Sequence, residues 1–192
     1  MEDQSNRQTQ TPEMGRRRFL ALGAAGLALP FLTRLPAFAS PAPLAPDRRL
    51  AFFNTHTGET AEVEYCRSGC LIPASLEKID HVLRDHRTGD IKDIDIRLLD
   101  LLYRLAGRLA TDCPFHVISG YRSPGTNAAL RAHGGGVAAN SLHLLGQAID
   151  IRLPGLKLRD LYKAAVDLRA GGVGIYPASD FVHVDVGRVR TW

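Results

Sequence analysis

Alternating apolar and polar positions mark two β-prone runs in the first half of the chain. The first run covers residues 50–57 and the second covers residues 59–66, with Gly58 between them. Period-two alternation is typical of a strand that buries one face, and a glycine between two such runs is typical of a turn. The pattern therefore predicts a β-hairpin.

Two helices are predicted after the hairpin, because apolar residues then recur at helical spacing. In the first, apolar side chains at positions 76, 79, 82 and 83 share one face, and Ser75 is a residue type that caps helix N-termini well. This helix is expected to end between residues 86 and 89. The second begins at Asp95 and carries so many leucines up to Leu109 that we expect a central helix buried on a broad face.

Strands and helices alternate in the rest of the chain. β-prone runs at residues 114–119, 147–152 and 181–186 are separated by helical patterns at residues 126–132 and 156–170. This order predicts an α+β domain in which helices flank a small, mainly antiparallel sheet. A domain of about 150 residues is large enough to bury roughly two thirds of the surface of its unfolded chain.

Residues 1–39 have the pattern of an export signal. Three arginines at positions 16–18 precede an apolar run at residues 21–32, and the A-x-A sequence at positions 37–39 suits signal cleavage. The paired arginines before Phe-Leu resemble the twin-arginine export signal. The apolar run is too short to span a bilayer comfortably, which takes about 20 apolar residues. An uncleaved anchor is the alternative interpretation.

This pattern predicts three parts of the chain. We expect a twin-arginine-type signal peptide at residues 1–39, a proline-rich linker at residues 40–49 and one domain at residues 50–192. The mature protein is then periplasmic, with no stable membrane span after signal cleavage.

The charge of the mature chain is close to balanced. Removing the five basic and three acidic residues before Ser40 lowers the formal net charge from +4 to +2. A nucleic-acid-binding domain normally carries a clustered basic face. We therefore expect no nucleic-acid partner.

The three cysteines do not form a recognisable zinc or redox motif. In an oxidising compartment Cys66 and Cys70 could form a disulfide, and free thiols for these two and Cys113 are the alternative. The pairing stays open on the sequence alone.

Candidate metal ligands come from two segments that are distant along the chain. Alternation in the strand at residues 147–152 places Asp150 opposite the isoleucines, and alternation in the last strand places His183 opposite the valines. If these strands are neighbours, both side chains point to one spot, and His143 enters from the preceding loop. Two imidazoles and one carboxylate leave a fourth position for water, the arrangement of a catalytic zinc. Water on such an ion ionises near neutral pH and attacks a carbonyl.

The motif S-x-H-x-x-G-x-A-x-D at residues 141–150, followed by His183 in a strand, resembles that of the zinc D-Ala-D-Ala metallopeptidases of the LAS-type superfamily. More closely, the chain resembles the exported YcbK-like peptidoglycan peptidases, through residues 54–59, 83–87, 118–123 and 172–185. The resemblance implies a Hedgehog/D-Ala-D-Ala-peptidase-like fold. It also implies a Zn²⁺ cofactor bound by His143, Asp150 and His183, and a peptidoglycan peptide as substrate.

The same resemblance implies that Arg122 lies over the site. A guanidinium there could bind a substrate carboxylate through two hydrogen bonds, or stabilise the negative charge that develops during catalysis. Ser141 would bind substrate or orient the histidine loop. A solvated loop arginine and an ordinary loop serine are the alternatives.

The sequence departs from the family at the position of the general base. That base is often a glutamate three residues before the last histidine, where this chain has Asp180, one methylene shorter. A base must reach the attacking water within hydrogen-bond distance. Asp180 is the first candidate for this catalytic role, and Asp185 is a rival whose other interpretation is a partner that orients a ligand imidazole.

Two classes of function follow. The first is an exported zinc-dependent endopeptidase or carboxypeptidase that hydrolyses peptide bonds in peptidoglycan during cell-wall biogenesis or remodelling. The second is a zinc-stabilised module that binds the cell wall without cutting it, motivated by the shortened base.

Overall fold

The computed structural model describes residues 46–133 and 138–192. The predicted signal peptide and most of the predicted linker lie outside the described residues. The first strand begins at Arg48, so the last two residues of the predicted linker belong to it. None of the helices in the described part of the chain is both long enough and apolar enough to cross a membrane.

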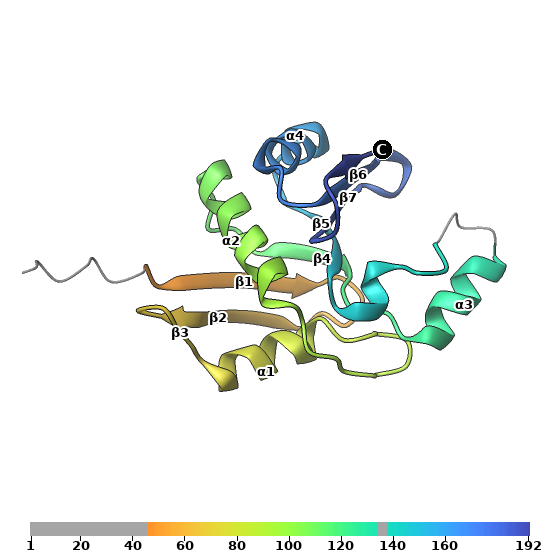
Figure 1. The fold of residues 1–192 in the computed structure, drawn as a ribbon, viewed down its shortest axis with the longest axis horizontal. Helices are drawn as coiled ribbons and strands as arrows, with labels where there is room; N and C mark the ends of the chain where they lie inside the picture. Colours follow the sequence, from red (N-terminus) through yellow and green to blue (C-terminus); the bar gives the residue numbers. More distant parts are fainter. Residues whose placement is uncertain (1–45, 134–137) are drawn as a thin grey trace, which may run out of the picture. The chain divides into compact units, whose positions relative to one another are not determined.

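One sheet organises the described domain, and its strands follow the order β3-β2-β1-β4-β5-β7-β6-β8 (Figure 1). The strands are β1 (Arg48–Asn54), β2 (Thr60–Arg67), β3 (Cys70–Leu71), β4 (Phe115–Ser119), β5 (Ala148–Arg152), β6 (Gly172–Tyr176), β7 (Phe181–Asp185) and β8 (Arg190–Thr191). The helices are α1 (Pro73–Val82), α2 (Ile96–Leu109), α3 (Pro124–Ala132) and α4 (Leu158–Leu168), with short 3₁₀ helices at Leu142–Leu145 and Pro177–Ser179.

The α+β class and the mainly antiparallel sheet are confirmed. The pairs β1–β4 and β6–β8 are parallel, and the other neighbouring pairs are antiparallel. The sheet has eight strands and is wider than expected, because β3, β6 and β8 were not predicted. β3 and β8 have two residues each, and β6 contains two glycines, which weaken the strand signal.

The predicted hairpin is confirmed, whereas the start of the following helix is corrected. β1 and β2 pair antiparallel across a turn in which Gly58 has a φ of +73°. Helix α1 begins at Pro73, and Ile72 precedes it without a side-chain cap, so Ser75 lies inside the helix and is not its N-cap. Proline suits the first turn because the N–H it lacks would have no helical partner there. The helix also ends at Val82, earlier than expected.

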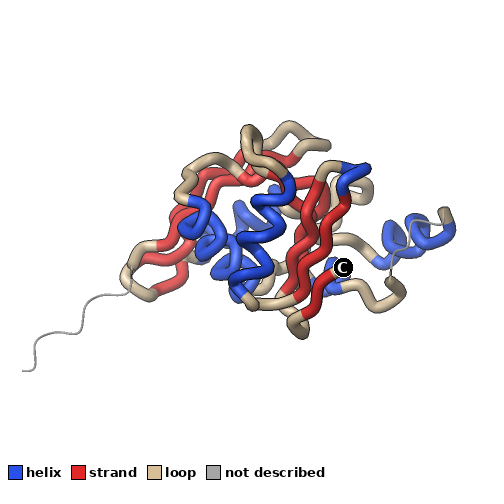
Figure 2. Tube along the Cα trace, turned by 90° about the horizontal axis from the view of Figure 1, so that it is seen from above, coloured by secondary structure: helices blue, strands red, loops and turns tan. Residues whose placement is uncertain are grey.

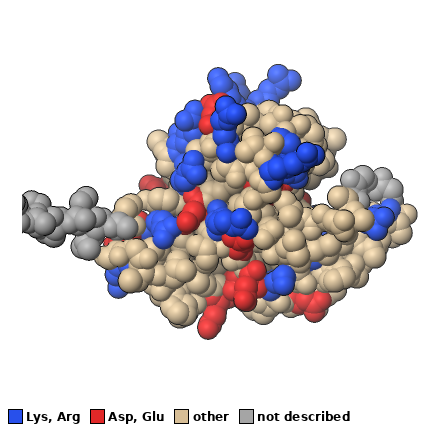
Figure 3. Space-filling view, in the orientation of Figure 1, with Lys and Arg blue, Asp and Glu red and all other residues tan. Residues whose placement is uncertain are grey.

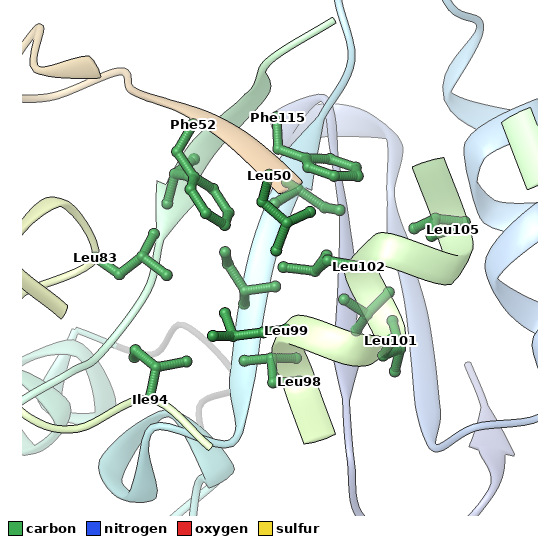
Figure 4. Close-up of a cluster of buried hydrophobic side chains, with 14 of the residues drawn as sticks. Leu50, Phe52, Leu83, Ile94, Leu98, Leu99, Leu101, Leu102, Leu105 and Phe115 are labelled. Atoms are coloured by element: carbon green, nitrogen blue, oxygen red, sulfur yellow. The ribbon is translucent and has the colours of Figure 1, made fainter. Parts of the chain in front are cut away.

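The leucine-rich helix begins where the sequence indicates. The Asp95 carboxylate accepts a hydrogen bond of 2.9 Å from the backbone N–H of Arg97, as an N-cap residue does. Five leucines of α2, from Leu98 to Leu105, are buried in one core with Leu50 and Phe52 of β1 and Phe115 of β4 (Figure 4). This helix is therefore the centre of the hydrophobic core, as the pattern predicts.

The helices differ in how closely they join this core. Figure 2 shows the strands curving around the central helices. Helix α4 packs on α2, β6 and β7, whereas α3 projects from the body of the domain (Figure 1). Figure 3 shows basic side chains gathered over the part of the domain where α4 lies, with acidic side chains below them.

Candidate metal centre

The two central ligand candidates face each other across neighbouring strands. β5 and β7 pair antiparallel, and Asp150 is the direct register partner of His183. Their strand neighbours Ile149 and Val184 are fully buried on the other face. The predicted alternation is therefore correct, and it puts a carboxylate and an imidazole on the face opposite these buried side chains.

His143 reaches the same spot from the 3₁₀ helix Leu142–Leu145. The Ser141 hydroxyl accepts from the backbone N–H of His143 at 3.4 Å, and Gly146 ends the helix with a φ of +65°. A Cβ at Gly146 would lie 2.5 Å from the carbonyl oxygen of Asp93, so glycine is required there for space as well as for conformation. The motif thus folds into a turn that presents His143.

The three side chains converge within the spacing that a metal needs. His143 Nε2 lies 3.2 Å from His183 Nδ1 and 3.3 Å from Asp150 Oδ1, and His183 Nδ1 lies 2.8 Å from the same oxygen. Ligands about 2.0–2.2 Å from a tetrahedral zinc are separated by about 3.3 Å. His143, Asp150 and His183 are therefore placed as ligands of one ion would be.

The hydrogen bonds behind the two imidazoles define which nitrogens face the cluster. His143 Nδ1 lies 2.7 Å from the carbonyl oxygen of Gly120, and since a carbonyl only accepts, this nitrogen carries the proton. His183 Nε2 lies 3.1 Å from a carboxylate oxygen of Asp185 and donates to it. In the neutral imidazoles the inward nitrogens then hold lone pairs, directed at each other and at the carboxylate of Asp150. Three acceptors at this distance require a cation between them.

A proton can partly fill that role when no metal is bound. Burial opposes a charged imidazolium at His183, but hydrogen bonds and charge from Asp150 and Asp185 outweigh it and raise the pKa of His183 to about 8. For Asp150, burial also favours the neutral acid, yet the two histidines together hold the pKa of this carboxyl well below its usual range. Both shifts show a site that attracts positive charge.

Asp185 is fully buried behind His183. Besides the imidazole, its carboxylate accepts hydrogen bonds from the backbone N–H groups of Gly172 at 2.9 Å and Gly187 at 2.8 Å, and from Arg190 at 2.7 Å. Burial disfavours the charged form, but these bonds keep the pKa of Asp185 well below its usual range. Such a carboxylate is suited to fix the tautomer and orientation of a ligand histidine.

The structure places Arg122 at the cluster. Its side chain is 9% exposed, and its Nη2 lies 3.3 Å from the hydroxyl of Ser119 and 3.5 Å from Asp150 Oδ2. Its Nε is buried and has no hydrogen-bond partner among the described residues. The guanidinium is therefore a buried cation with donor capacity to spare.

A cavity of about 360 Å³ opens over these groups. It is lined by the three candidate ligands, Arg122, Ser141, Asp185 and Phe181, and by three residues that the sequence did not single out: Tyr176, Arg190 and Trp192. The sequence signal that could have pointed to Arg190 and Trp192 is the pair of alternating glycines in β6, Gly172 and Gly174. Glycines at alternate positions leave part of a strand face without side chains, so another segment can pack across it.

The structure does not bring Asp180 to the cluster. Its side chain is 64% exposed, and its carboxylate lies 3.2 Å from Arg152 Nη1. Both residues line a separate cavity of about 270 Å³. The reason is local: Asp180 follows the 3₁₀ helix Pro177–Ser179 with a φ of +51°, outside the strand whose alternation directs His183. The preferred candidate for the base is thus not in the cavity that holds His183.

The cysteines are apart from this site. Cys66 is buried, Cys70 and Cys113 are exposed, and all three are free thiols. The disulfide that the spacing of Cys66 and Cys70 left open is therefore not formed in this structure.

Comparisons with known proteins match nearly the whole described domain. A family model described as Peptidoglycan L,D-endopeptidase MepK matches residues 43–192. The protein of that name from Escherichia coli (strain K12) is 46% identical over 180 residues, which cover 94% of this chain and 98% of the relative. The Probable peptidoglycan L,D-endopeptidase MepK of Haemophilus influenzae is 39% identical over 183 residues, covering 94% and 96%.

Proposed function

Because this chain belongs to the Peptidoglycan L,D-endopeptidase MepK family, we infer that it hydrolyses peptide bonds in peptidoglycan. Membership also confirms the resemblance to the YcbK-like subgroup. The observation that carries the function is near-complete coverage of both chains at 46% identity, with the motif residues gathered in one cavity. Because the relatives are named L,D-endopeptidases, we propose that the bond cut is an L,D peptide bond in a cross-link.

We further propose that the cofactor is zinc, held by His143, Asp150 and His183. The fit is supported by the three converging acceptors, since a donor set of two imidazoles and one carboxylate is typical of catalytic zinc. When bound, the ion would supply a Lewis acid for the substrate carbonyl and would lower the pKa of water. A Hedgehog/D-Ala-D-Ala-peptidase-like fold belongs to the same proposal.

The residues around the ligands have separate roles in this proposal. The Gly120 carbonyl and the Asp185 carboxylate hold the protons of the two imidazoles on the outer nitrogens. Arg122 contacts Asp150 Oδ2 and directs its remaining donor capacity to a substrate oxygen, either a carboxylate or the carbonyl that gains negative charge. Ser141 has its hydroxyl engaged with the backbone N–H of His143, which supports a role in shaping the loop.

Export through the twin-arginine route to the periplasm remains part of the proposal. It is supported by the arginines at positions 16–18, the apolar run and the A-x-A sequence that follow one another before Ser40. Replacing Arg16 and Arg17 by lysine should leave the precursor in the cytoplasm, as cell fractionation would show. Normal export of that variant would contradict the proposal.

The test of the activity is mass spectrometry of fragments released from isolated sacculi and from purified cross-linked muropeptides. We expect the protein to cleave L,D cross-links in preference to D,D cross-links, and a chelator to abolish cleavage until zinc is restored. His143→Ala should be inactive, whereas Asp180→Ala should cleave like the wild type, because its carboxylate lies in the other cavity.

The outcome also decides between the two classes of function. Binding to sacculi without any released peptide, in the presence of each divalent metal tried, would favour the non-cutting module. Cleavage by His143→Ala at the wild-type rate would reject the ligand assignment and leave the peptidase function in place.

A further inference from the structure

The last residues of the described chain lie across the site because two positions of β6 that face it, 172 and 174, are glycines. Gly172 and Gly174 share the face of β6 that adjoins His183 and Asp185. A Cβ on Gly174 would lie 2.5 Å from the indole of Trp192, and a Cβ on Gly172 would collide with the Arg190 guanidinium. The two glycines therefore form a trough, which is filled by the side chains of Arg190 in β8 and of Trp192, the residue after β8.

Trp192 is held in this trough on several sides. Its backbone N–H donates to the carbonyl of Val173 at 3.2 Å, and its carbonyl accepts from the N–H of Ile175 at 3.1 Å. The guanidinium of Arg190 lies 4.9 Å from the centre of the indole, and the His183 ring lies 5.3 Å away. The indole is thus fixed next to a candidate metal ligand.

The indole in turn fixes Tyr176. Trp192 Nε1–H donates a hydrogen bond of 2.7 Å to the Tyr176 hydroxyl oxygen. The Tyr176 ring stacks on Phe181 with centroids 4.6 Å apart and an angle of 20° between the planes. Since its oxygen accepts from the indole, the hydroxyl keeps its own proton for donation to another group. Tyr176 lines the same cavity as Arg122.

Packing alone does not account for this arrangement. Tyr176 is 39% exposed and Trp192 is 46% exposed, so each buries only part of its ring and gains correspondingly little from the hydrophobic effect. An aromatic cluster that served only stability would not need two polar groups joined to each other in the lining of a cavity. The hydrogen bond orients a hydroxyl donor instead.

We propose that the Tyr176 hydroxyl, oriented by the indole of Trp192, donates a hydrogen bond to a carbonyl or carboxylate oxygen of the peptide substrate beside Arg122. Tyr176 is then a substrate-binding and specificity residue, and Trp192 is a positioning residue that acts through it. The inference rests on the proposed peptidase function for its substrate class. The Tyr176 hydroxyl and the Arg122 guanidinium are then the two donors that hold substrate oxygens in this site.

The experiment compares the full-length mature protein with three variants on a soluble cross-linked muropeptide. Removing one donor to a substrate oxygen in Tyr176→Phe should lower kcat/KM about tenfold. Trp192→Phe keeps an aromatic ring but loses the N–H. It should lower kcat/KM by roughly threefold, because the Tyr176 hydroxyl is no longer held in one orientation. The double variant should match Tyr176→Phe alone, because Trp192 has nothing left to orient.

Control measurements separate this role from a structural one. Tyr103→Phe, on α2 and outside the cavity, should have wild-type kinetics. Zinc content and melting temperature should be the same in Tyr176→Phe and the wild type. Losses that add up in the double variant, or wild-type kcat/KM in Tyr176→Phe, would overturn the inference.

A binding measurement keeps the inference separate from the proposed function. Isothermal titration calorimetry with the same muropeptide should show weaker affinity for Tyr176→Phe than for the wild type. If the wild type binds the muropeptide but never cuts it, the proposed function fails, and weaker binding by Tyr176→Phe would still support this inference. The inference is rejected if the two proteins have equal affinity and equal turnover. It is also rejected if neither protein cuts the muropeptide and both bind it equally well.

Discussion

The strand pair β5–β7 has two faces with opposite chemistry. One face carries β-branched apolar side chains that are fully buried in the core: Ile149, Ile151, Val182 and Val184. The other face carries ionisable side chains that contact one another: Asp150, His183 and Asp185. The same backbone hydrogen bonds hold both faces, so the difference between them comes from the side chains alone.

The two faces depend on different kinds of interaction. Burial on the apolar face stabilises roughly in proportion to area and has no preferred direction, so shape and volume decide its contribution. The polar face depends on the direction of single lone pairs and protons, because three acceptors converge on one point. Changes on the first face should alter stability, and changes on the second should alter metal binding and turnover.

The largest effect is expected from a ligand on the polar face. His183→Gln keeps a polar side chain beside Asp185 but removes the imidazole, and it should lower cleavage of muropeptides at least about a thousandfold. The free energy of unfolding of the metal-free protein should fall by only about 1–3 kcal/mol, the cost of leaving a buried polar group without its partner. Activity assays and urea unfolding of the same preparation measure both. A large loss of stability without loss of bound zinc would contradict the division between the faces.

The opposite result is expected for Ile151, which follows Asp150 in β5 and lies on the apolar face. Ile151→Ala removes a fully buried side chain, and it should lower the free energy of unfolding by about 2–5 kcal/mol. Turnover per folded molecule should stay close to that of the wild type. Ile151→Val serves as the matched control, with a loss of about 0.5–1.5 kcal/mol. Reduced zinc affinity in the folded alanine variant would show that the faces are coupled.

An intermediate effect is expected from Asp185, which touches His183 without reaching the cluster itself. Asp185→Asn keeps the shape of the side chain but weakens its hold on the His183 proton. We expect zinc affinity to fall about tenfold to a hundredfold, the range seen for carboxylates behind ligand histidines. Competition with a fluorescent chelator measures this affinity. Trp192 is the only tryptophan in the sequence, so quenching of its emission by Co²⁺ offers a second readout next to His183.

The smallest effect concerns His86, whose ring nitrogens have no carboxylate partner among the residues that the structure describes. The ring of His86 stacks on His56 with centroids 3.8 Å apart, and burial together with nearby positive charge lowers the pKa of His86 to about 4. The unfolded chain binds this proton near its ordinary pKa of about 6.5. The stability from neutral His86 is therefore present above pH 6.5 and is lost as the pH falls toward 4.

Urea unfolding between pH 6.5 and pH 4 tests whether His86 stabilises the protein in its neutral form. The difference in unfolding free energy between wild type and His86→Gln should shrink by about 1 kcal/mol as the pH falls from 6.5 to 4, a value reduced for the partial exposure of the ring. Asp85, whose pKa is lowered, affects stability only below about pH 4 and does not mask the change. A difference that grows on acidification would show that His86 is stabilised in its charged form.

Much of the fold and the convergence of His143, Asp150 and His183 could be predicted, because the patterns behind them are local. Alternation in β5 and β7 determines which side chains share a face, and Asp95 caps α2 through its own carboxylate. Ser75 was assigned as a cap from its residue type, but Pro73 starts that helix two residues earlier. Asp180 was assigned from its spacing to His183, but a left-handed backbone conformation places it in another cavity.

The sequence by itself determined the family, the two strands that carry Asp150 and His183, and the turn that presents His143. Each of these depends on residues close together in the chain, so spacing and residue type are sufficient. Only the tertiary structure decided that Trp192 and Arg190 join the site and that Asp180 does not. The first result depends on how β8 lies along the glycines of β6, a packing contact between separate segments that no local pattern encodes. The second depends on the left-handed backbone conformation of Asp180, which has a φ of +51°.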